Sequence, residues 1–245
     1  MRVALIADIH GNLVALDAAL AEIARERVDQ VVCLGDVAAT GPRPAETIER
    51  LQGLGCPVVM GNADAWLLDP EPSGVDDEDI RRIEAIDRWC AARLSAAQLA
   101  YVATFQPLVQ VALDDGVALL CFHGSPRSYD DIILATTPDD ELDRMLAGHR
   151  ATVLAGGHTH AQVLRRHQHA VLINPGSVGL PYEQIGSPGQ TRNPPWAEYA
   201  VVGWAAGRLS VDLRRVPVDV GAVIRDARAS GMPHAEWWAR DWAPA

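Results

Sequence analysis

Over its first 62 residues the chain alternates short apolar runs with segments whose apolar residues recur at helical spacing. The apolar runs are residues 2–8, 28–36 and 55–62, and the helical segments between them are residues 12–27 and 44–54. Proline is favoured at the first position of a helix, so Pro44 marks the start of the second helical segment. Strands that alternate with helices usually pair in parallel, and the pattern therefore predicts a layered α/β fold.

The rest of the chain continues with helices and then with short strands. Residues 66–105 favour helix, with an acidic and solvated start at 75–89. Residues 108–124 indicate a hairpin around the turn signal Asp115-Gly116. After a helix at 137–149, we expect short strands at 151–158, 161–167, 169–176, 198–204 and 208–216, and a helix at 218–230. The second half is therefore predicted to be rich in antiparallel pairs. Residues 179–196, rich in Gly and Pro, are the longest candidate loop, and long loops are often functional.

Size and composition limit the classes of protein that fit. A chain of 245 residues can form one α/β domain with a full core, and we assign residues 1–245 to a single domain. The net charge of −11 argues against extended nucleic acid or an anionic membrane as a partner, because both need basic patches. We expect no signal peptide and no membrane span. Cys33 and Cys121 fall in strand-like runs, so buried reduced thiols and a cytoplasmic location are expected.

Most of the predicted strands end in side chains that can bind a metal ion. In open α/β sheets, ligands gather at the carboxyl edge, where successive strands deliver their last side chains to one crevice. Residues two apart in an extended chain face the same way, so Asp8 with His10, and His158 with His160, can each point into one site. The seven candidate metal ligands are Asp8, His10, Asp36, Asn62, His123, His158 and His160.

Two carboxylates, one amide oxygen and four imidazoles are too many ligands for a single ion. A mixture of oxygen and imidazole ligands suits Mn, Fe, Zn or Ni. Two divalent ions bridged by a carboxylate, ~3.5–4 Å apart, would use all seven. These ions bring four positive charges, of which Asp8, Asp36 and a bridging hydroxide remove three. The sequence therefore predicts a positive centre that attracts an anionic phosphate.

Each candidate also has an ordinary structural interpretation. Asp36 can be a turn aspartate, Asn62 can occupy a left-handed turn after Gly61, and His123 can be a hydrogen-bonded, semi-buried histidine. The order of the motifs, each of which closes a predicted strand, favours the metal site. We expect the remaining histidines at the surface or at helix ends; they are His149, His167, His169 and His234.

The chain resembles the calcineurin-like metallophosphoesterase superfamily, whose signature runs D-x-H, G-D, G-N-[HC]-[DE], a lone H, and G-H-x-H. Here the motifs are DIH (8–10), GD (35–36), GNAD (61–64), HG (123–124) and GHTH (157–160). The segments GPRPAETI, HGSPRS and NPGSVGLP are similar to the small bacterial and archaeal branch of that superfamily. The resemblance covers residues 1 to about 215. It implies an α/β fold, a four-layer αββα sandwich with two mixed β-sheets and a dimetal site at the strand ends.

The family pattern, carried over residue by residue, also implies the ligands of each ion. The first metal would be bound by Asp8, His10, Asp36 and His160. The second would be bound by Asp36, Asn62, His123 and His158. A hydroxide shared by the two ions would attack phosphorus in line while the metals neutralise the developing charge. Asp36, which bridges the ions, and Asn62 are therefore candidate catalytic residues as well.

One position departs from the family pattern. Many members have a histidine directly after the asparagine of the third motif, where it can protonate the leaving oxygen, but this chain has Ala63. General acid catalysis is typically worth ~10²–10⁴-fold, so substrates with poor leaving groups should suffer most. The small branch often lacks this histidine and is associated with phosphodiesters. Asp64 is a further candidate, which can orient a ligand or be an ordinary first-turn helix aspartate.

Two arginines are candidates to clamp a phosphate through a bidentate fork, although both also fit as solvated loop residues. They are Arg127, which we select as a candidate catalytic residue, and Arg192. Trp237, Trp238 and Trp242 are expected to dock on the core or to form a dimer contact. The segment NPGSVG is expected to support the site by backbone packing.

These features predict a metal-dependent phosphoric ester hydrolase with a small phosphorylated substrate, a phosphodiester or a nucleotide-type phosphate. The alternatives are a phosphomonoesterase, a dinucleoside-polyphosphate hydrolase, or a metal-binding interaction scaffold like the retromer subunit of the superfamily. Seven intact ligands favour chemistry, and the alanine at position 63 favours the scaffold. Homo-oligomerisation is left open.

Overall fold

The computed structural model describes residues 1–185 and 191–242. Its strands are β1 (Arg2–Ile6), β2 (Gln30–Cys33), β3 (Val109–Asp114), β4 (Val117–Cys121), β5 (Val153–Ala155), β6 (Gln162–His167), β7 (Ala170–Pro175), β8 (Glu183–Gln184), β9 (Thr191–Arg192), β10 (Trp196–Ala205) and β11 (Arg208–Pro217). Its helices are α1 (Leu13–Ile23), α2 (Pro44–Leu54), α3 (Asn62–Leu68), α4 (Glu78–Arg93), α5 (Ala96–Val102), α6 (Asp139–Met145), α7 (Val220–Ala229) and α8 (Ala235–Arg240).

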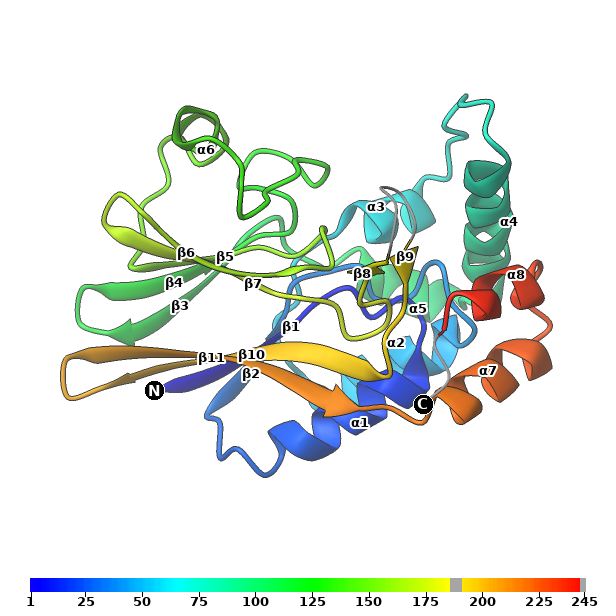
Figure 1. Cartoon of the computed structure of the whole chain (residues 1–245), viewed down its shortest axis with the longest axis horizontal. Coiled ribbons are helices and arrows are strands. Elements are labelled where there is room, and N and C mark those ends of the chain that lie inside the picture. The colour runs from blue at the N-terminus through cyan, green and yellow to red at the C-terminus, as the bar shows by residue number, and fades with distance from the viewer. Residues whose placement is uncertain (186–190, 243–245) are drawn as a thin grey trace.

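The strands form two mixed sheets and a short ribbon (Figure 1). The four-stranded sheet has the order β11-β10-β1-β2, in which β1 and β2 are parallel and the other pairs antiparallel. The five-stranded sheet has the order β3-β4-β5-β7-β6, with parallel pairs around β5 and an antiparallel pair at each edge. Strands β8 and β9 pair as the ribbon. Both large sheets are mixed, as the family resemblance implied.

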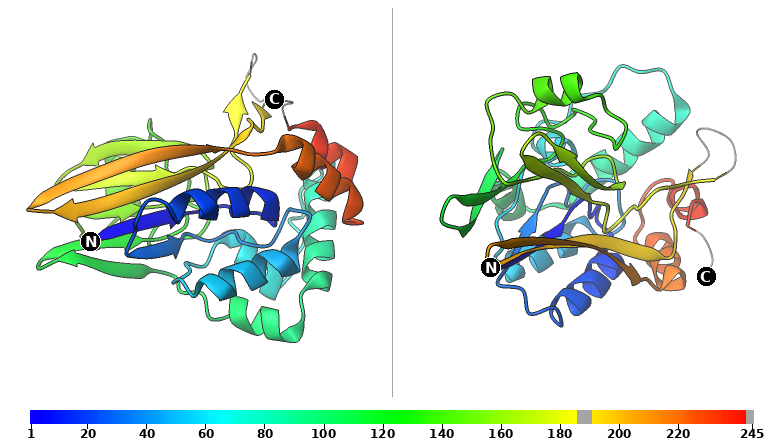
Figure 2. Two further views of the ribbon diagram at one scale, coloured as in Figure 1. Left: turned by 90° about the horizontal axis from the view of Figure 1, so that it is seen from below. Right: turned by 60° about the vertical axis from the view of Figure 1, so that its left-hand side comes forward.

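The two large sheets pack face to face, and helices cover their outer faces (Figure 2). Apolar side chains of β1, β2, β4 and β10 meet between the sheets in one buried cluster. A second cluster packs α1, α2 and α7 against the outer face of the four-stranded sheet. A third packs α6 against the five-stranded sheet. The architecture is therefore the expected αββα sandwich, in which α6 forms the helical layer on the five-stranded sheet.

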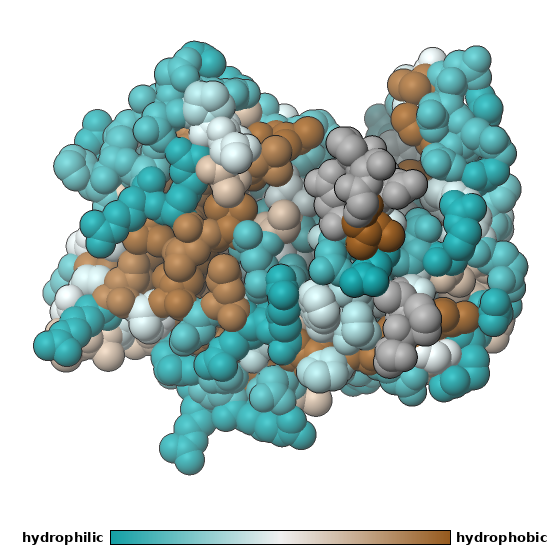
Figure 3. Space-filling model, viewed as in Figure 1, coloured by the Kyte–Doolittle hydropathy of each residue, from teal (hydrophilic) through white to brown (hydrophobic). Residues whose placement is uncertain are grey.

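The core between the sheets is partly open along one side. The edge strands there are β6 and β11, and apolar atoms gather between them on the face shown in Figure 3. Leu164 of β6 is 52% exposed, and Leu209, Val211 and Leu213 of β11 are only partly buried. No helix of the described residues is long and apolar enough to cross a membrane.

Most predicted elements are confirmed, and one is wrong in part. The hairpin around Asp115-Gly116 is β3–β4, and the acidic segment after Asp77 begins α4. Residues 55–62 were expected to form a third strand, but only isolated bridges at Val58 and Val59 join them to their neighbours. Pro57 in this run has no N–H to donate, which limits the pairing. The second half holds antiparallel hairpins, as expected, but also the parallel pairs of β5.

Candidate metal centre

The loops that follow β1, β2, β4 and β5 bring six of the seven predicted ligands together, and the seventh, Asn62, is the first residue of α3. In five of the seven, the backbone is left-handed: Asp8 (φ 54°), His10 (φ 48°), Asp36 (φ 54°), His158 (φ 69°) and His160 (φ 56°). Such conformations cost roughly 1–3 kcal/mol each in a residue other than glycine, and they concentrate at functional sites. Strands β1 and β5 stop at Ile6 and Ala155, before these residues. The argument from an extended chain was therefore wrong in its reason, because turns rather than strands aim the pairs.

Hydrogen bonds to the backbone fix these turns. The N–H of Asp8 donates to the carbonyl of Gly35 (3.0 Å) and that of His10 to the carbonyl of Asp36 (3.0 Å), so the turns continue the pairing of β1 with β2. The hydroxyl of Ser177, in the segment NPGSVG, donates to the carbonyl of Asp8 (2.7 Å). The N–H of Gly179, in the same segment, donates to the same carbonyl (3.0 Å), so the segment supports the site through its backbone, as the sequence predicted.

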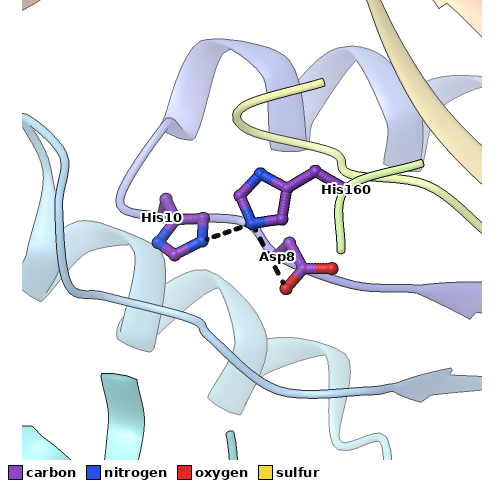
Figure 4. Close-up of side chains that lie close together, drawn as sticks. All are labelled: Asp8, His10 and His160. Carbon is purple, nitrogen blue, oxygen red and sulfur yellow. Dashed lines mark hydrogen bonds and ion pairs between the residues drawn. The ribbon is translucent and has the colours of Figure 1, made fainter. Parts of the chain in front are cut away.

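Among the residues that the structure describes, two groups of side chains could bind a metal ion, and Asp8, His10 and His160 form the first of them (Figure 4). The Nε2 atoms of the two histidines face each other at 3.1 Å. Nε2 of His160 lies 3.6 Å from Oδ1 of Asp8. All three side chains are buried. Each therefore presents a potential ligand atom to one small space.

Asp36, His123 and His158 form the second group, and Asn62 lies beside it. Nε2 of His123 is 3.3 Å from Oδ2 of Asp36 and 3.0 Å from Oδ1 of Asn62. The same Oδ2 of Asp36 lies 3.7 Å from Nε2 of His10, which belongs to the first group. Asp36 is thus placed between the two groups.

The ring orientations test whether a cation fits. Nδ1 of His10, His123 and His160 each meets a backbone carbonyl, at 3.2, 2.7 and 2.7 Å. A carbonyl only accepts, so each Nδ1 carries the proton, and the neutral ring then turns an Nε2 lone pair into the site. The two lone pairs of His10 and His160 face each other at 3.1 Å, an arrangement that a positive ion between them relieves. The residues present therefore fit metal ions.

The same geometry displaces the pKa values of these groups. Burial, assisted by the nearby His10, lowers the pKa of His160 to about 3. Burial also opposes the charged form of His123, but the Asp36 carboxylate outweighs it and raises the pKa of His123 to about 10. The pKa of Asp36 is lowered although burial opposes this, because His123 lies against it. Without an ion, a proton on His123 would balance the Asp36 charge.

Asp64 holds the backbone around Asp36. It is fully buried, and its carboxylate accepts the N–H groups of Asp36 (2.7 Å), Val37 (2.8 Å) and Gly61 (3.1 Å). Burial, together with the Asp36 charge, raises the pKa of Asp64 to about 7. Its position suits a residue that orients a ligand from behind, with no contact to the ligand atoms themselves.

The two candidate arginines lie in ion pairs. The guanidinium of Arg127 contacts both carboxylate oxygens of Asp131, with the shorter distance 2.6 Å. Arg192 on β9 pairs with Glu183 on β8 at 2.8 Å. Both side chains are about half exposed. Part of each guanidinium is therefore engaged by a neighbouring carboxylate.

A cavity of about 490 Å³ opens above the two groups. It contains five of the predicted ligands and reaches α3, α4 and the loop after Ser177. Its lining residues are His10, Asp36, Thr40, Asn62, Ala63, Trp66, Glu71, Ser73, Ile80, Ile83, Glu84, Asp87, Asp130, His158, His160, Leu180 and Tyr182. Tyr182 stacks on His160, with ring centroids 4.7 Å apart.

The sequence reasoning missed several of these lining residues. Tyr182 lies in the Gly- and Pro-rich loop that the sequence marked as a candidate functional loop, so its position there could have indicated a role at the site. Thr40, Trp66 and Asp87 gave no such signal, because they stand in a turn and in helices with no distinctive spacing.

For single residues outside the site, the structure contradicts one expectation and confirms another. His167 is wrong as a surface residue, because it is buried, with its Nε2 2.9 Å from Oδ1 of Asp143. Trp238 and Trp242 are buried in the core, as one of the two interpretations held. The indole of Trp238 donates to the carbonyl of Thr40 (2.7 Å), which ties α8 to the edge of the cavity.

Comparison with known proteins gives the class to which this fold and site belong. Residues 1–192 match the model of the calcineurin-like phosphoesterase superfamily domain, and the chain belongs to this family. Of curated proteins, it is 29% identical to the uncharacterized protein MJ0912 of Methanocaldococcus jannaschii over 198 residues, 75% of this chain and 78% of that one.

Two solved structures extend the likeness over nearly the whole chain. A metallophosphoesterase from Sphaerobacter thermophilus has a TM-score of 0.73 and 27% identity, with 98% of this chain and 97% of that one covered. The hypothetical protein PH1004 from Pyrococcus horikoshii OT3 has a TM-score of 0.81, with 98% and 96% covered. At 20% identity the second shows the fold alone.

Proposed function

We propose that this chain is a dimetal phosphoesterase that hydrolyses small phosphodiesters or nucleotide-type phosphates. The ligands of the first ion are Asp8, His10, Asp36 and His160. The ligands of the second are Asp36, Asn62, His123 and His158. The observation that carries the proposal is the position of Oδ2 of Asp36, 3.7 Å from His10 and 3.3 Å from His123. Because one carboxylate oxygen borders both groups, it can bridge two ions.

Two divalent ions, when bound, polarise the phosphoryl group and activate a water molecule for attack. The residues of the chain position the ligand side chains and shield them from water. Three backbone carbonyls fix the histidine rings, Asp64 fixes the loop of Asp36, and Tyr182 covers His160. The donor set of carboxylate, amide and imidazole accepts Mn, Fe, Zn or Ni, so cellular supply decides among them.

The charge of the cavity favours a diester over a monoester. Beyond the ligands, its lining among the described residues holds four acidic side chains and no arginine; the acidic residues are Glu71, Glu84, Asp87 and Asp130. A monoester is a dianion near neutral pH, because its second pKa is about 6, whereas a diester carries one negative charge. Beyond the two metal ions, the second negative charge would meet acidic side chains, and no arginine among the described lining residues would balance it. A diester therefore fits this lining better.

The test combines metal analysis with a substrate panel. We expect about two ions per chain after reconstitution with manganese or zinc. We expect bis(p-nitrophenyl) phosphate to be hydrolysed with a higher kcat/KM than p-nitrophenyl phosphate, and a dinucleoside polyphosphate should show whether nucleotide-type substrates enter. Two bound ions with no turnover of any ester would contradict the proposal and favour an interaction scaffold. Homo-oligomerisation stays a prediction, to be checked by light scattering.

A further inference from the structure

Ala63 leaves the cavity without a proton donor at the start of α3. It is the second residue of that helix and lines the cavity next to Asn62. The methyl group of alanine cannot donate a proton, yet the alkoxide that leaves a phosphoester needs one unless it is already a weak base. A positioned acid in such a reaction is typically worth ~10²–10⁴-fold.

A carboxyl group on the next helix faces the same cavity. Asp87 lies on α4, which packs against α3 (Figure 1), and it lines the cavity together with Ala63 and the ligand histidines. Oδ1 of Asp87 accepts the hydroxyl of Thr40 at 2.8 Å. Thr40 has a left-handed backbone (φ 66°), and its carbonyl accepts the indole N–H of Trp238. The carboxyl group is thus tied to the loop that carries Asp36.

Asp87 differs from its neighbour Glu84, which lies one helical turn earlier. Glu84 accepts the N–H of Ser73 (2.7 Å) and pairs with Arg88 (3.2 Å), and both contacts stabilise its ionised form. Asp87 has no arginine within ion-pair distance among the residues that the structure describes. The sequence contains no lysine, because all 21 of its Lys and Arg residues are arginine.

The groups around Asp87 therefore favour its protonated form. Burial is the main cause, and the Asp36 and Glu84 carboxylates add to it, while the bond from Thr40 opposes it. The pKa of Asp87 is raised to about 7. Cys90, on the same helix, is a buried thiol whose own pKa is raised to about 12, so it is neutral there. Burial thus keeps a proton on Asp87 near neutral pH.

We propose that Asp87 is the proton donor to the leaving-group oxygen, the role that Ala63 cannot fill. The step rests on the proposed phosphoesterase function. As water oxygen bonds to phosphorus, the phosphorus–oxygen bond to the leaving group breaks and its electron pair stays on the leaving oxygen. That oxygen takes the proton of the Asp87 carboxyl group. The proton that the attacking water gives up passes to solvent, and the Asp87 carboxylate takes one proton back from solvent before the next turnover, so the net reaction is diester plus water to monoester plus alcohol.

The kinetic test uses Asp87→Asn in the zinc-loaded full chain. Asparagine keeps the shape and still accepts the hydroxyl of Thr40. For methyl p-nitrophenyl phosphate, with a good leaving group, kcat should stay within a small factor of wild type. For a dinucleotide, whose leaving group is an alkoxide, kcat should fall ~10²–10³-fold with little change in KM. In wild type, kcat for the dinucleotide should fall as pH rises through the pKa of Asp87. In the variant, this decrease at high pH should be absent.

A second readout does not depend on activity. The carboxyl carbon of Asp87, identified by its loss in the variant, is titrated by ¹³C NMR in the metal-free and the zinc-loaded protein. We expect a pKa near 7 without metal and a lower value with zinc, because two cations favour the carboxylate, but still above the ordinary 3.8. Zinc content should be the same in wild type and variant.

Matched variants separate the outcomes. Glu84→Gln, on the same helix and in the same cavity, should leave the dependence on the leaving group unchanged. Ala63→His added to Asp87→Asn should restore part of the dinucleotide turnover. Equal loss for both leaving groups, or an ordinary pKa for Asp87 in the zinc form, would overturn the assignment to Asp87. Loss of the proposed function is distinguishable, since wild type would then hydrolyse neither ester.

Discussion

The floor and the outer wall of the cavity are built in different ways. The floor is formed by the seven ligand residues, five of which line the cavity while Asp8 and His123 are fully buried; most of the seven are buried on left-handed turns that backbone hydrogen bonds hold. The outer wall consists of the cavity-lining residues from Trp66 to Asp87, and its ion pair Glu84–Arg88 lies at the surface. Surface pairs of this kind contribute about 0–1 kcal/mol. Changes in the floor should therefore affect metal binding and folding together, whereas changes in the wall should leave the metal content unchanged and act on the substrate and its turnover, with smaller effects on folding.

The largest effect is expected from Asp36→Asn. The amide is neutral and a weaker bridging ligand, and Oδ2 of Asp36 borders both metal groups. Losing several kcal/mol of metal-derived stabilisation lowers kcat by about 10³-fold or more. Metal analysis should give fewer than two ions per chain. Asp115→Asn, in the exposed turn of β3–β4, is the control and should change neither quantity. Near-normal activity in Asp36→Asn would refute the bridging role.

The next effect is expected from Asp64→Asn, which removes the support of Asp36. The NH2 group of asparagine would replace one of the two carboxylate oxygens and would then face a backbone N–H, which is also a donor. The N–H left without an acceptor would be that of Val37, or those of Asp36 and Gly61. Leaving such a group unpaired costs about 1–3 kcal/mol of unfolding free energy. Loss of a support behind a ligand should also weaken metal binding ~10–100-fold. Urea unfolding and metal titration measure the two effects, with exposed Asp69→Asn after α3 as the control.

The floor could be predicted from the sequence far better than the wall. The motifs around His10 and His158 predict metal binding directly, because residue types that bind metal ions recur at the ends of apolar runs. Their left-handed turns could not be predicted, since the choice depends on packing between the sheets. Asp87 sits in a helix whose acidic and apolar spacing is typical of any solvated helix. Only the fold places this carboxyl group, nearly fifty residues from Thr40, against the hydroxyl that orients it.

A smaller effect is expected from Gly61→Ala. A Cβ at this position would lie 2.1 Å from Oδ1 and 2.5 Å from the nitrogen of Asp36, so the loop must move. Such overpacking costs about 1–3 kcal/mol. Gly53→Ala is the matched control: it stands in α2 with nothing within 4 Å of its Cβ, and it should stabilise the chain by roughly 0.5–1 kcal/mol. Equal unfolding free energies for the two variants would contradict a tight contact at Gly61.

The smallest effect is expected in the wall, where the free energy of unfolding should depend on pH differently for variants of Asp87 and of Glu84. Burial raises the folded pKa of Asp87 to about 7 from 3.8. Its contribution to stability is therefore present below pH ~4 and is lost as pH rises through 7, by on the order of 1 kcal/mol or more. Asp87→Asn should gain stability over wild type in that window. The hydrogen bond from Ser73 lowers the pKa of Glu84 from its ordinary 4.5, so its contribution to stability is present above that value and is lost as pH falls below it; Glu84→Gln should therefore lose stability relative to wild type as pH rises through this acidic window. Unfolding of the metal-free proteins at pH ~3.5, ~5 and ~8 measures both differences, the lower pair of values for Glu84 and the upper pair for Asp87; differences of the same sign would show that the two carboxylates share one environment.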